Sequence, residues 1–328
     1  MPSLSVLMTN YNHGKYIAEA LEAIIGQSFK PKEIIVIDDA STDDSIRIIE
    51  GFVNKCQNLR LLRNEKNLGT LYSINRALKI ASGDYVYSAA ADDKILPGFF
   101  EKSMELLERY PEAGLCLSEP LYFNESRSAY FKEVLKIADR PCYLSSQKIV
   151  DLLRRRYFLL AGHSSIIKRD SLLRAGGYIP DLKWHCDWFA SYVVAFREGM
   201  CYLPENLAYL RLSSGSYSSS AKRSRIIQQE IVRAIMDKLK SSSYNDVYEA
   251  FRDSGILSIY GVEMFRLMYK HPRYRDFYSA KIFRYVVKDI FKAFVPPGLK
   301  NMFRKTRGHY LSSPDRKDFR EEAKNGDF

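Results

Sequence analysis

The feature that most constrains the fold is a regular alternation between short apolar runs and longer amphipathic stretches in the first 120 residues. Polar breakers bound each apolar run, as in buried strands, and each following stretch carries apolar residues three and four positions apart, as in packed helices. Four strand–helix pairs in succession predict a mainly parallel, Rossmann-like central sheet flanked by helices. The predicted strands are Leu4–Met8, Ile34–Ile37, Leu59–Leu62, Tyr85–Tyr87 and Leu115–Leu117, and the predicted helices are Tyr16–Ile25, Ser45–Val53, Leu71–Ile80 and Phe99–Leu107.

The chain has 328 residues, which is enough for this sheet and a second region. Hydrophobic residues make up 46% of it, which excludes a disordered polyelectrolyte. A Ser-rich stretch at 213–220 separates the alternating part from a helical, Tyr-, Arg- and Lys-rich part. We therefore predict an α/β domain over residues 1–217 and a basic helical C-terminal extension over residues 218–328.

The cysteines and the N-terminus bear on cellular location. The five cysteines form no CxxC pair, which predicts neither a zinc cluster nor a disulfide framework and favours a reducing compartment. The N-terminus enters the first predicted strand without a signal-peptide pattern, and no stretch approaches the ~18 apolar residues of a spanning helix. These features favour a cytoplasmic protein without a transmembrane anchor. The cysteines are Cys56, Cys116, Cys142, Cys186 and Cys201.

The net charge of +11 is unevenly distributed along the chain. Residues 1–120 carry 13 basic and 17 acidic side chains, a net charge of −4. Residues 121–220 have a net charge of +5 and residues 221–328 a net charge of +10. The basic excess therefore belongs to the C-terminal region, and the first half offers no basic face for nucleic acid.

Carboxylates follow two of the predicted strands. Asp38 and Asp39 come directly after the second strand, and Asp92 and Asp93 come shortly after the fourth. Ligands of parallel sheets bind outside the carboxyl ends of the strands. Carboxylate oxygens suit Mg²⁺ or Mn²⁺, and substrate phosphates can supply the remaining ligands. The pattern predicts a divalent cation that bridges the protein to a diphosphate.

A second interpretation of these polar residues is helix capping. Asp92 and Asp93 precede a helix predicted to start near Pro97, and Ser41 or Thr42 precedes the helix after the second strand. Taken alone, either cluster is explained better by a cap than by a site. Two clusters at neighbouring strand ends favour a site.

Five motifs follow one another between residue 3 and about residue 217: VLMTNYNHGKYIAEALEAIIGQSF, EIIVIDDASTDDS, LLRNEKNLGTLYSINRAL, ASGDYVYSAAADD and DLKWHCDWF. In this order they resemble a family 2 glycosyltransferase of the GT-A fold. The resemblance implies a nucleotide-diphosphate-sugar donor, a divalent metal ion, Mg²⁺ or Mn²⁺, and an inverting transfer to an acceptor hydroxyl. It assigns donor and metal binding to residues 1–120 and the acceptor side to residues 121–217.

The resemblance implies a nucleoside site. Thr9 and Tyr11 match residues that grip the nucleoside, and Asp39 matches a carboxylate that reads the uracil or ribose, which indicates a UDP-sugar. Asn67 and Gly69 match the loop beside the nucleotide. For Asn67, a plain turn role remains an equal alternative.

The resemblance also implies a metal–diphosphate site. Asp92 matches a residue near the ribose and donor sugar, and Asp93 matches the metal ligand. Arg211 matches an arginine that approaches the diphosphate from a closing loop, where its forked guanidinium suits phosphate oxygens. Ser213 stands where many relatives have a metal-binding His.

Asp187 matches the general base, which takes the proton of the acceptor hydroxyl on the face opposite the leaving group. A simple cap of the following helix is the alternative. Trp184 and His185 are candidate acceptor-binding residues, and Trp188 could also stack on a sugar. For these residues, and for His163 on the acceptor side, burial in the core is an equal alternative.

Three positions depart from the family pattern. Ala91 replaces the first acid of the DXD-type motif, Cys186 stands where an acid often precedes the base, and Ala40 replaces a common Gly. The carboxylates that the chemistry most needs, Asp93 and Asp187, are both present.

Residues 281–307 contain eight basic side chains and one acid. Lys281, Arg284, Lys288 and Lys292 recur at helical spacing, opposite an apolar side, until Pro296 ends the helix. Such a helix can lie in the interface of an anionic membrane. Two interpretations stay open: peripheral association with the inner face of the cytoplasmic membrane, or packing on the catalytic domain with the basic side in solvent.

The expected process is the assembly of a cell-surface polysaccharide or lipid-linked glycan. A sugar nucleotidyltransferase is an alternative, but it needs a Gly- and Arg-rich phosphate loop that TNYNHGKY does not supply. A nucleic-acid-binding protein is a second alternative, motivated only by the net charge. A dinucleotide dehydrogenase would need G-x-G-x-x-G after the first strand, and that motif is absent.

Overall fold

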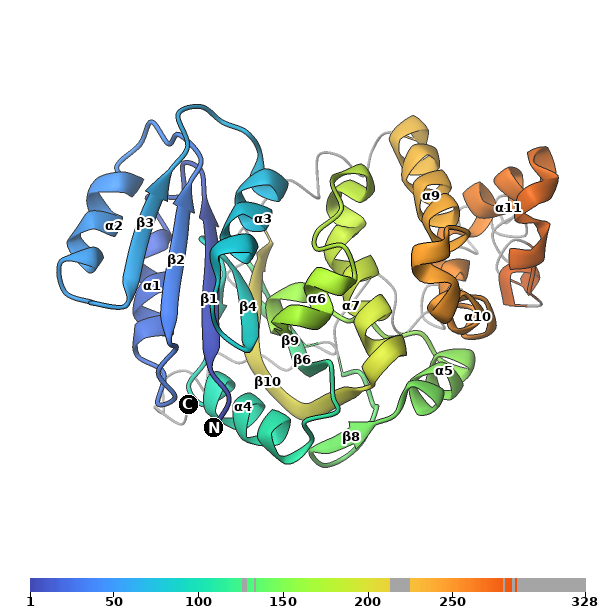
Figure 1. The fold of residues 1–328 in the computed structure, drawn as a ribbon, viewed down its shortest axis with the longest axis horizontal. Helices are drawn as coiled ribbons and strands as arrows, with labels where there is room; N and C mark the ends of the chain where they lie inside the picture. The colour runs from blue at the N-terminus through green and yellow to red at the C-terminus, as the bar shows by residue number, and fades with distance from the viewer. Residues whose placement is uncertain (126–128, 133, 213–224, 280, 285–286, 288–328) are drawn as a thin grey trace. The chain divides into compact units, whose positions relative to one another are not determined.

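The fold is described from a computed structural model, which describes residues 1–125, 129–132, 134–212, 225–279, 281–284 and 287 (Figure 1). These residues divide into two compact units. The first unit runs to Ser146 and resumes at Leu159, and the second contains Gln147–Phe158 together with the described residues from Arg225 onward. The second unit therefore includes Gln147–Phe158, a segment that the sequence analysis placed in the α/β domain, within residues 121–217.

The first unit contains the predicted alternation, and the predicted strands and helices are all present. Their ends differ from the prediction by at most three residues, except that the strand predicted to end at Leu117 extends to Asn124. Among the described residues, its strands join into one sheet. They are β1 (Leu4–Asn10), β2 (Glu33–Asp38), β3 (Leu59–Arg63), β4 (Tyr85–Ala90), β5 (Lys94–Ile95), β6 (Leu115–Asn124), β7 (Ala129–Lys132), β8 (Cys142–Leu144), β9 (Ser165–Lys168) and β10 (Met200–Leu212). The first four helices are α1 (Ile17–Ile25), α2 (Ser45–Val53), α3 (Thr70–Ile80) and α4 (Phe99–Arg109).

The order of the first four strands is β3-β2-β1-β4, and each neighbouring pair is parallel. The chain therefore moves outward from β1 to β3 and then crosses back to place β4 on the other side of β1. Because such crossovers are right-handed, α1 and α3 lie on opposite faces of the sheet (Figure 1). The strand order reverses between β1 and β4, and ligands of open α/β sheets bind outside the carboxyl ends of the strands at such a point.

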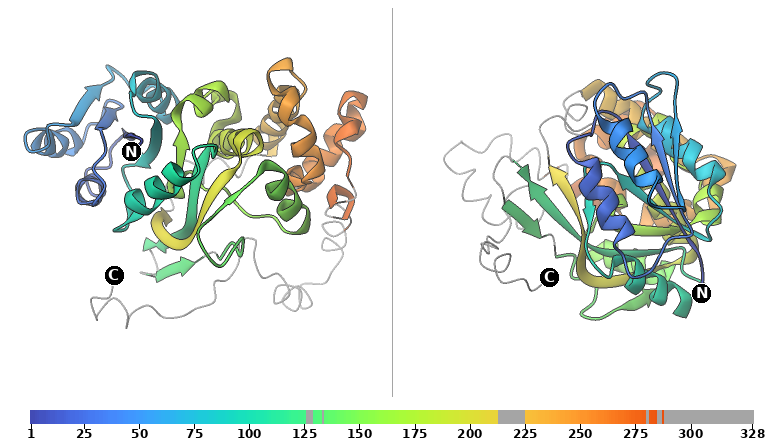
Figure 2. Two further views of the ribbon diagram at one scale, coloured as in Figure 1. Left: turned by 60° about the horizontal axis from the view of Figure 1, so that its bottom comes forward. Right: turned by 90° about the vertical axis from the view of Figure 1, so that its left-hand side faces the viewer.

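Beyond β4 the sheet becomes mixed. β9 pairs antiparallel with both β4 and β6, whereas β10 pairs parallel with β6 and antiparallel with β5 and β8. The pairing of β10 with β6 shifts register on both sides of Asn206, which bends β10 (Figures 1 and 2). The bend lets one strand pair with β8 at its start and with β5 near its end.

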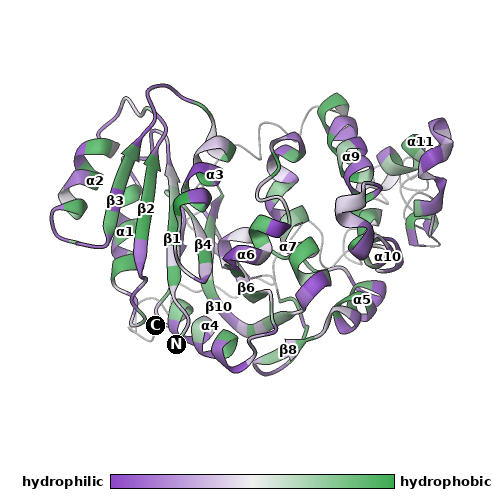
Figure 3. Ribbon diagram, in the orientation of Figure 1, coloured by the Kyte–Doolittle hydropathy of each residue, from purple (hydrophilic) through white to green (hydrophobic). Residues whose placement is uncertain are grey.

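The core of the first unit lies between the sheet and its helices. The strands β1 and β2 are buried along almost their whole length and consist mainly of Leu, Val and Ile, as expected of strands covered on both faces (Figure 3). α7 (Cys186–Glu198) is also buried from Trp188 to Phe196, so it is an internal helix of this unit. The other helices among the described residues of the first unit are η2 (Gly162–Ser164), α6 (Arg169–Arg174) and η3 (Pro180–His185).

The second unit is helical, as predicted for the C-terminal extension. It is built around buried residues of α9, α10 and α11, including Ile235, Phe251 and Met264. Among the described residues of the chain, no helix is both long and apolar enough to cross a bilayer. Its elements are α5 (Ser146–Arg155), α9 (Arg225–Leu239), η4 (Ser242–Tyr244), α10 (Asn245–Asp253), η5 (Ile256–Tyr260), α11 (Gly261–Lys270) and η6 (Pro272–Phe277).

The described start of the basic C-terminal segment corrects the predicted position of Lys281. Its side chain packs against Gly255, and its ammonium donates to the carbonyl oxygens of Leu153 and Ser254. Ile282 beside it is buried. Lys281 is therefore not part of a solvent-facing basic surface; it is anchored in the second unit. Lys288 and Lys292 lie outside the described residues.

Candidate functional site

The carboxyl end of β1 presents the predicted nucleoside-binding residues. The Thr9 hydroxyl lies 3.0 Å from that of Thr70, the first residue of α3. Tyr11 follows the strand and is 43% exposed, so part of its side chain is accessible at this end of β1. An exposed aromatic ring at this position can stack on a nucleobase.

Asp39 organises the loop that follows β3. Its Oδ1 accepts hydrogen bonds from Asn64 Nδ2 at 2.6 Å and from the Leu68 amide at 2.9 Å, and its Oδ2 accepts from the Gly69 amide at 2.7 Å. A carboxylate has about four lone-pair positions, so roughly one remains for a ligand. Asp39 is 2% exposed, and its first role is therefore to hold this loop against β2.

Asn67 and Gly69 lie in that loop as predicted. The Asn67 side-chain oxygen accepts from the Gly69 amide at 3.0 Å, which is the turn role considered in the sequence analysis. Gly69 has a φ of +88°, a conformation that favours glycine, and it precedes the first residue of α3. Asn67 and Gly69 thus set the backbone conformation of the turn that leads into α3.

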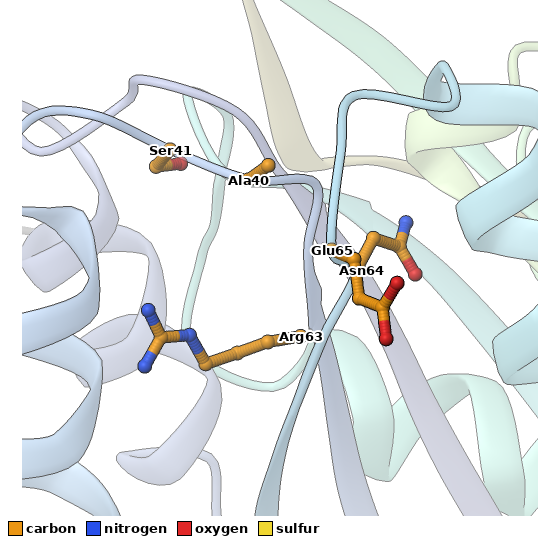
Figure 4. A pocket seen from close by; sticks show the side chains of 5 residues that line it. All are labelled: Ala40, Ser41, Arg63, Asn64 and Glu65. Atoms are coloured by element: carbon orange, nitrogen blue, oxygen red, sulfur yellow. The ribbon is translucent and has the colours of Figure 1, made fainter.

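A hollow of about 350 Å³ lies beside Asp39 at the ends of β2 and β3. Figure 4 shows Ala40 and Ser41 on one side of it, with Arg63, Asn64 and Glu65 extending from the end of β3. The sequence analysis did not select these β3 residues. Asn64 connects Asp39 to α3. Its Nδ2 donates to Asp39, and its Oδ1 accepts a hydrogen bond from Arg76 Nη1 at 2.6 Å.

Asp92 and Asp93 lie on the turn between β4 and β5. The capping interpretation is wrong for this pair, because α4 begins at Phe99 with Gly98 as its N-cap. It is also wrong for Ser41, whose hydroxyl donates to Asp38 at 2.6 Å, while Asp44 is the N-cap of α2. The two carboxylates therefore do not cap α4, and they follow β4, the strand that pairs with β1.

Strand register explains why Arg211 reaches this turn. Tyr209 on β10 pairs with Lys94 on β5, directly after Asp93, so that Arg211 two residues later comes level with Asp92 and Asp93. The Arg211 amide donates to Asp93 Oδ1 at 2.8 Å, and its Nε donates to the Asp92 carbonyl at 2.9 Å. Arg211 thus holds the turn through both its backbone and its side chain.

The position of Arg211 corrects the predicted closing loop. The residue belongs to strand β10 and is 8% exposed. Its guanidinium carbon lies 4.6 Å from the ring centre of Tyr16 and 5.4 Å from that of Phe123, and its Nη2 donates to Glu19 Oε2 at 3.0 Å. A planar cation held between rings and a carboxylate has a fixed orientation beside the Asp92–Asp93 turn.

The surroundings of the Asp93 carboxyl suit a neighbouring cation. Its side chain is almost completely buried, and burial followed by the charge of Asp92 raises its pKa well above the ordinary value. Ionised oxygens in this position would be stabilised by a divalent cation. Within the described ranges, no group of three or more His, Cys, Asp and Glu side chains is placed to hold a metal ion. Ser213 lies outside the described residues.

Asp187 lies in the first turn of α7, whose N-cap is His185. Its Oδ1 accepts from the Trp188 amide at 2.8 Å. Its Oδ2 faces η2, because a Cβ added to Gly162 would lie 2.9 Å from that oxygen. A carboxylate at a helix N-terminus is stabilised in its ionised form, which is the form that a general base requires.

The aromatic residues near Asp187 differ in exposure. Trp188 is 4% exposed and packs on Tyr192, so the predicted stacking of Trp188 on a sugar is wrong. Trp184 and His185 are partly exposed, with ring centres 5.9 Å apart. Among the described residues, Trp184 Nε1 has no hydrogen-bond partner, and Lys183 before it has a φ of +48°, an unfavourable backbone conformation for a non-glycine residue.

His163 lies on η2, the turn that faces Asp187. Burial lowers its pKa to about 4, so the ring is neutral near pH 7. Its Nε2 is buried and finds no partner among the described residues. The structure therefore places a neutral imidazole on the predicted acceptor side.

Tyr178 is hydrogen-bonded to β4, the strand that precedes the Asp92–Asp93 turn. The Tyr178 hydroxyl lies 2.7 Å from the Ser88 hydroxyl on β4. Burial raises the pKa of Tyr178, the Ser88 hydroxyl lowers it, and the nearby charge of Asp187 raises it further. Tyr178 was missed in the sequence because nothing local distinguishes it from a core tyrosine.

Glu19 and Tyr16 on α1 were also missed as site residues. Glu19 Oε1 accepts from Lys94 Nζ at 3.0 Å, and the Tyr16 hydroxyl donates to Glu125 at 2.9 Å. Burial raises the pKa of Glu19, but the hydrogen bond and charge of Lys94 and the charge of Arg211 outweigh it, so the pKa is lowered. Glu19 is separated from Arg211 by most of the first unit's sequence, so no local pattern could reveal the pair.

The half of the sheet formed by β1 to β4 is parallel, and the Asp92–Asp93 turn follows β4. The other half is mixed, and its strand β10 returns to that turn by pairing with β5. This arrangement defines the GT-A class of folds. The sequence profile of glycosyl transferase family 2 matches residues 5–174. The chain belongs to glycosyl transferase family 2.

Among curated proteins, the chain is 34% identical over 125 residues to a putative glycosyltransferase, EpsE, of Bacillus subtilis, covering 38% of this chain and 45% of that protein. It is 31% identical over 172 residues to an uncharacterized glycosyltransferase of Methanocaldococcus jannaschii, covering 47% of this chain and 59% of the relative. The chain thus spans about half the length of these relatives.

Two solved structures share the fold. The S. aureus TarS fragment 1–349 in complex with UDP-GlcNAc superposes with a TM-score of 0.60 at 18% identity, covering 95% of both chains. The mannosyltransferase PcManGT from Pyrobaculum calidifontis, in complex with GDP-Man and Mn²⁺, superposes with a TM-score of 0.57 at 16% identity, covering 93% of this chain and 84% of that one.

Proposed function

We propose that this chain is an inverting, divalent-metal-dependent glycosyltransferase that uses a nucleotide-diphosphate sugar. The observation that carries the proposal is the Asp92–Asp93 turn, which lies at the β1–β4 crossover and is held by Arg211. Asp93, with Asp92 beside it, would hold Mg²⁺ or Mn²⁺, which would stabilise the departing diphosphate. Family membership favours this reaction over the nucleotidyltransferase and nucleic-acid-binding alternatives.

We infer that the donor is a UDP-sugar. Tyr11 would stack on the base, and the remaining lone pair of Asp39 would accept from the uracil N–H. Thr9 and the Asn67–Gly69 loop would contact the ribose. The structural relatives include complexes with UDP-GlcNAc and with GDP-Man, so a GDP-sugar is the competing donor.

Asp187 would act as the general base. It would accept the proton of the acceptor hydroxyl as the new bond to the anomeric carbon forms and the bond to the diphosphate breaks. Its partly exposed neighbours Trp184 and His185 would contact the acceptor. The position of Asp187 opposite Gly162, close to Tyr178 and therefore to β4, supports this assignment.

We further propose that the acceptor is a cell-surface polysaccharide or lipid-linked glycan. GgaB of Bacillus subtilis, named a minor teichoic acid biosynthesis protein, is 29% identical over 171 residues, covering 51% of this chain and 18% of that protein. All five cysteines are free thiols, which favours the cytoplasm. The basic residues beyond 287 would contact the inner face of an anionic membrane.

The test is Mn²⁺-dependent release of the nucleotide diphosphate from UDP-glucose, UDP-GlcNAc and GDP-mannose. Asp93→Asn and Asp187→Asn should each lower turnover of the preferred donor about 100-fold or more, because they remove a metal ligand and a general base. Asp170→Asn, which changes an exposed carboxylate on α6, is the matched control. Undiminished turnover in both variants would refute the assignment.

A further inference from the structure

Glu19 on α1 joins two strands at the edge of the metal–diphosphate site. Its Oε1 accepts from Lys94 Nζ at 3.0 Å and from the Tyr209 hydroxyl at 3.3 Å, and its Oε2 accepts from Arg211 Nη2 at 3.0 Å. Lys94 belongs to β5, and Tyr209 and Arg211 belong to β10. One carboxylate therefore fixes the side chains that flank the Asp92–Asp93 turn on both strands.

The connection from Glu19 to the turn passes through Arg211. Its Nε donates to the Asp92 carbonyl at 2.9 Å, and its amide donates to Asp93 Oδ1 at 2.8 Å. The guanidinium is planar, so the Glu19 contact at Nη2 sets the direction in which Nε points. The Tyr16 ring, 4.6 Å from the guanidinium carbon, restricts movement out of that plane but does not determine rotation within it.

Charge provides a second argument. The Arg211 side chain is 8% exposed and that of Glu19 44%, so Glu19 compensates a largely buried cation from the solvent side. Without that negative charge, the guanidinium would be drawn towards the carboxylates of Asp92 and Asp93. It would then compete with a divalent cation for the same oxygens.

Given the function proposed above, on which this role rests, we propose that Glu19 is a positioning residue for the metal–diphosphate site. It holds Arg211 and Lys94 away from the carboxylates of the turn while leaving Arg211 bonded to the Asp92 carbonyl. Glu19 contacts neither metal nor substrate in this role. It acts on them through Arg211.

The test measures the affinity of the full-length protein for Mn²⁺ in the presence of excess UDP, from the electron paramagnetic resonance signal of free Mn²⁺. Glu19→Gln keeps the shape of the side chain and removes its charge. The Kd for Mn²⁺ should rise about 10-fold, since loss of a partner behind a metal ligand weakens metal binding by roughly 10- to 100-fold. Glu22→Gln, an exposed carboxylate one turn further along α1, should leave the Kd unchanged.

A double-mutant cycle distinguishes positioning from general destabilisation. In an Arg211→Gln background, Glu19→Gln should raise the Kd no further, because the two residues act in series. Independent, multiplying effects on the Kd would overturn the proposal. If Glu19→Gln does not fold, Arg211→Lys, which keeps the charge but loses the bond from Nε, should give the same rise of about 10-fold.

Asp93→Asn separates failure of the inference from failure of the function. If Asp93→Asn binds Mn²⁺ with the wild-type Kd, the proposed function is wrong. If Asp93→Asn loses Mn²⁺ binding while Glu19→Gln retains the wild-type Kd, the metal site stands and the role of Glu19 is refuted.

Discussion

Ala40 has a backbone conformation that residues with a side chain rarely adopt. Its φ is +63°, and it lies between Asp39 and the loop that lines the hollow at the end of β2. A left-handed conformation costs an L-residue about 1–2 kcal/mol, which exceeds the entropy that glycine loses on folding. Ala40, which stands where the family commonly has Gly, therefore makes the folded protein less stable than a glycine would.

We predict that Ala40→Gly raises the free energy of unfolding by about 0.5–1 kcal/mol. Urea denaturation measures it. The control is Ala18→Gly on α1, at an ordinary helical position, which should lower stability by about 1 kcal/mol. Equal destabilisation by both substitutions would contradict the strain at Ala40.

His163 predicts a pH dependence of stability. Its pKa is about 4 in the folded protein, against an ordinary value of 6.5. Between these values the unfolded chain binds more protons, so the stabilisation present above pH 6.5 is lost as the pH falls towards 4. The loss is on the order of 3 kcal/mol.

The variant His163→Asn removes the titrating ring. Its free energy of unfolding should change less with pH across this window than that of the wild type, as measured by urea denaturation at a series of pH values. An identical slope in both proteins would show that His163 is accessible to protons in the folded state.

At the scale of elements, the alternation of residue types was sufficient to predict β1 to β4 and α1 to α4. Each of these elements buries its own apolar pattern, so local sequence determines it. Two features needed the structure. The transfer of α5 to the second unit depends on long-range packing, and the contact of Arg211 with Asp92 depends on the register of β5 with β10.

The same distinction applies to the site. Asp39, Asp92 and Asp93 follow predicted strands, so a topological rule was enough to select them. Glu19, Asn64 and Tyr178 act through partners far away in sequence, and a buried or paired side chain has no distinctive local pattern.

Lys281 connects elements of the second unit. Its ammonium donates to carbonyl oxygens at the C-terminal parts of α5 and α10, where the helix dipole favours a cation. Lys281→Met should lower the stability of this unit by about 1–2 kcal/mol, seen as faster hydrogen exchange in α5 and α10. Lys270→Met, at an exposed position of α11, is the control, and equal exchange in both variants would contradict the anchoring role.

At the scale of the whole molecule, the net positive charge bears on where the protein is located in the cell more than on the sugar transfer proposed above. The sequence from 288 to 307 carries six of the eight basic residues counted from 281, while the anchored Lys281 belongs to the second unit. A chain ending at residue 287 keeps the anchor and loses this charge. It should no longer sediment with vesicles containing anionic phospholipid, whereas the full chain should.

Vesicles of neutral phospholipid are the control, because neither chain should bind them. Retained sedimentation of the shortened chain with anionic vesicles would move the membrane contact to another part of the molecule.

The most direct test of the central claim is anomalous diffraction from Mn²⁺ in crystals grown with UDP. We predict a single strong peak within bonding distance of the Asp93 carboxylate, about 2 Å, bridged to the diphosphate, with the uracil beside Tyr11 and Asp39. A diphosphate bound elsewhere, or Mn²⁺ bound without contact to Asp93, would contradict the claim that the Asp92–Asp93 turn is the metal–diphosphate site.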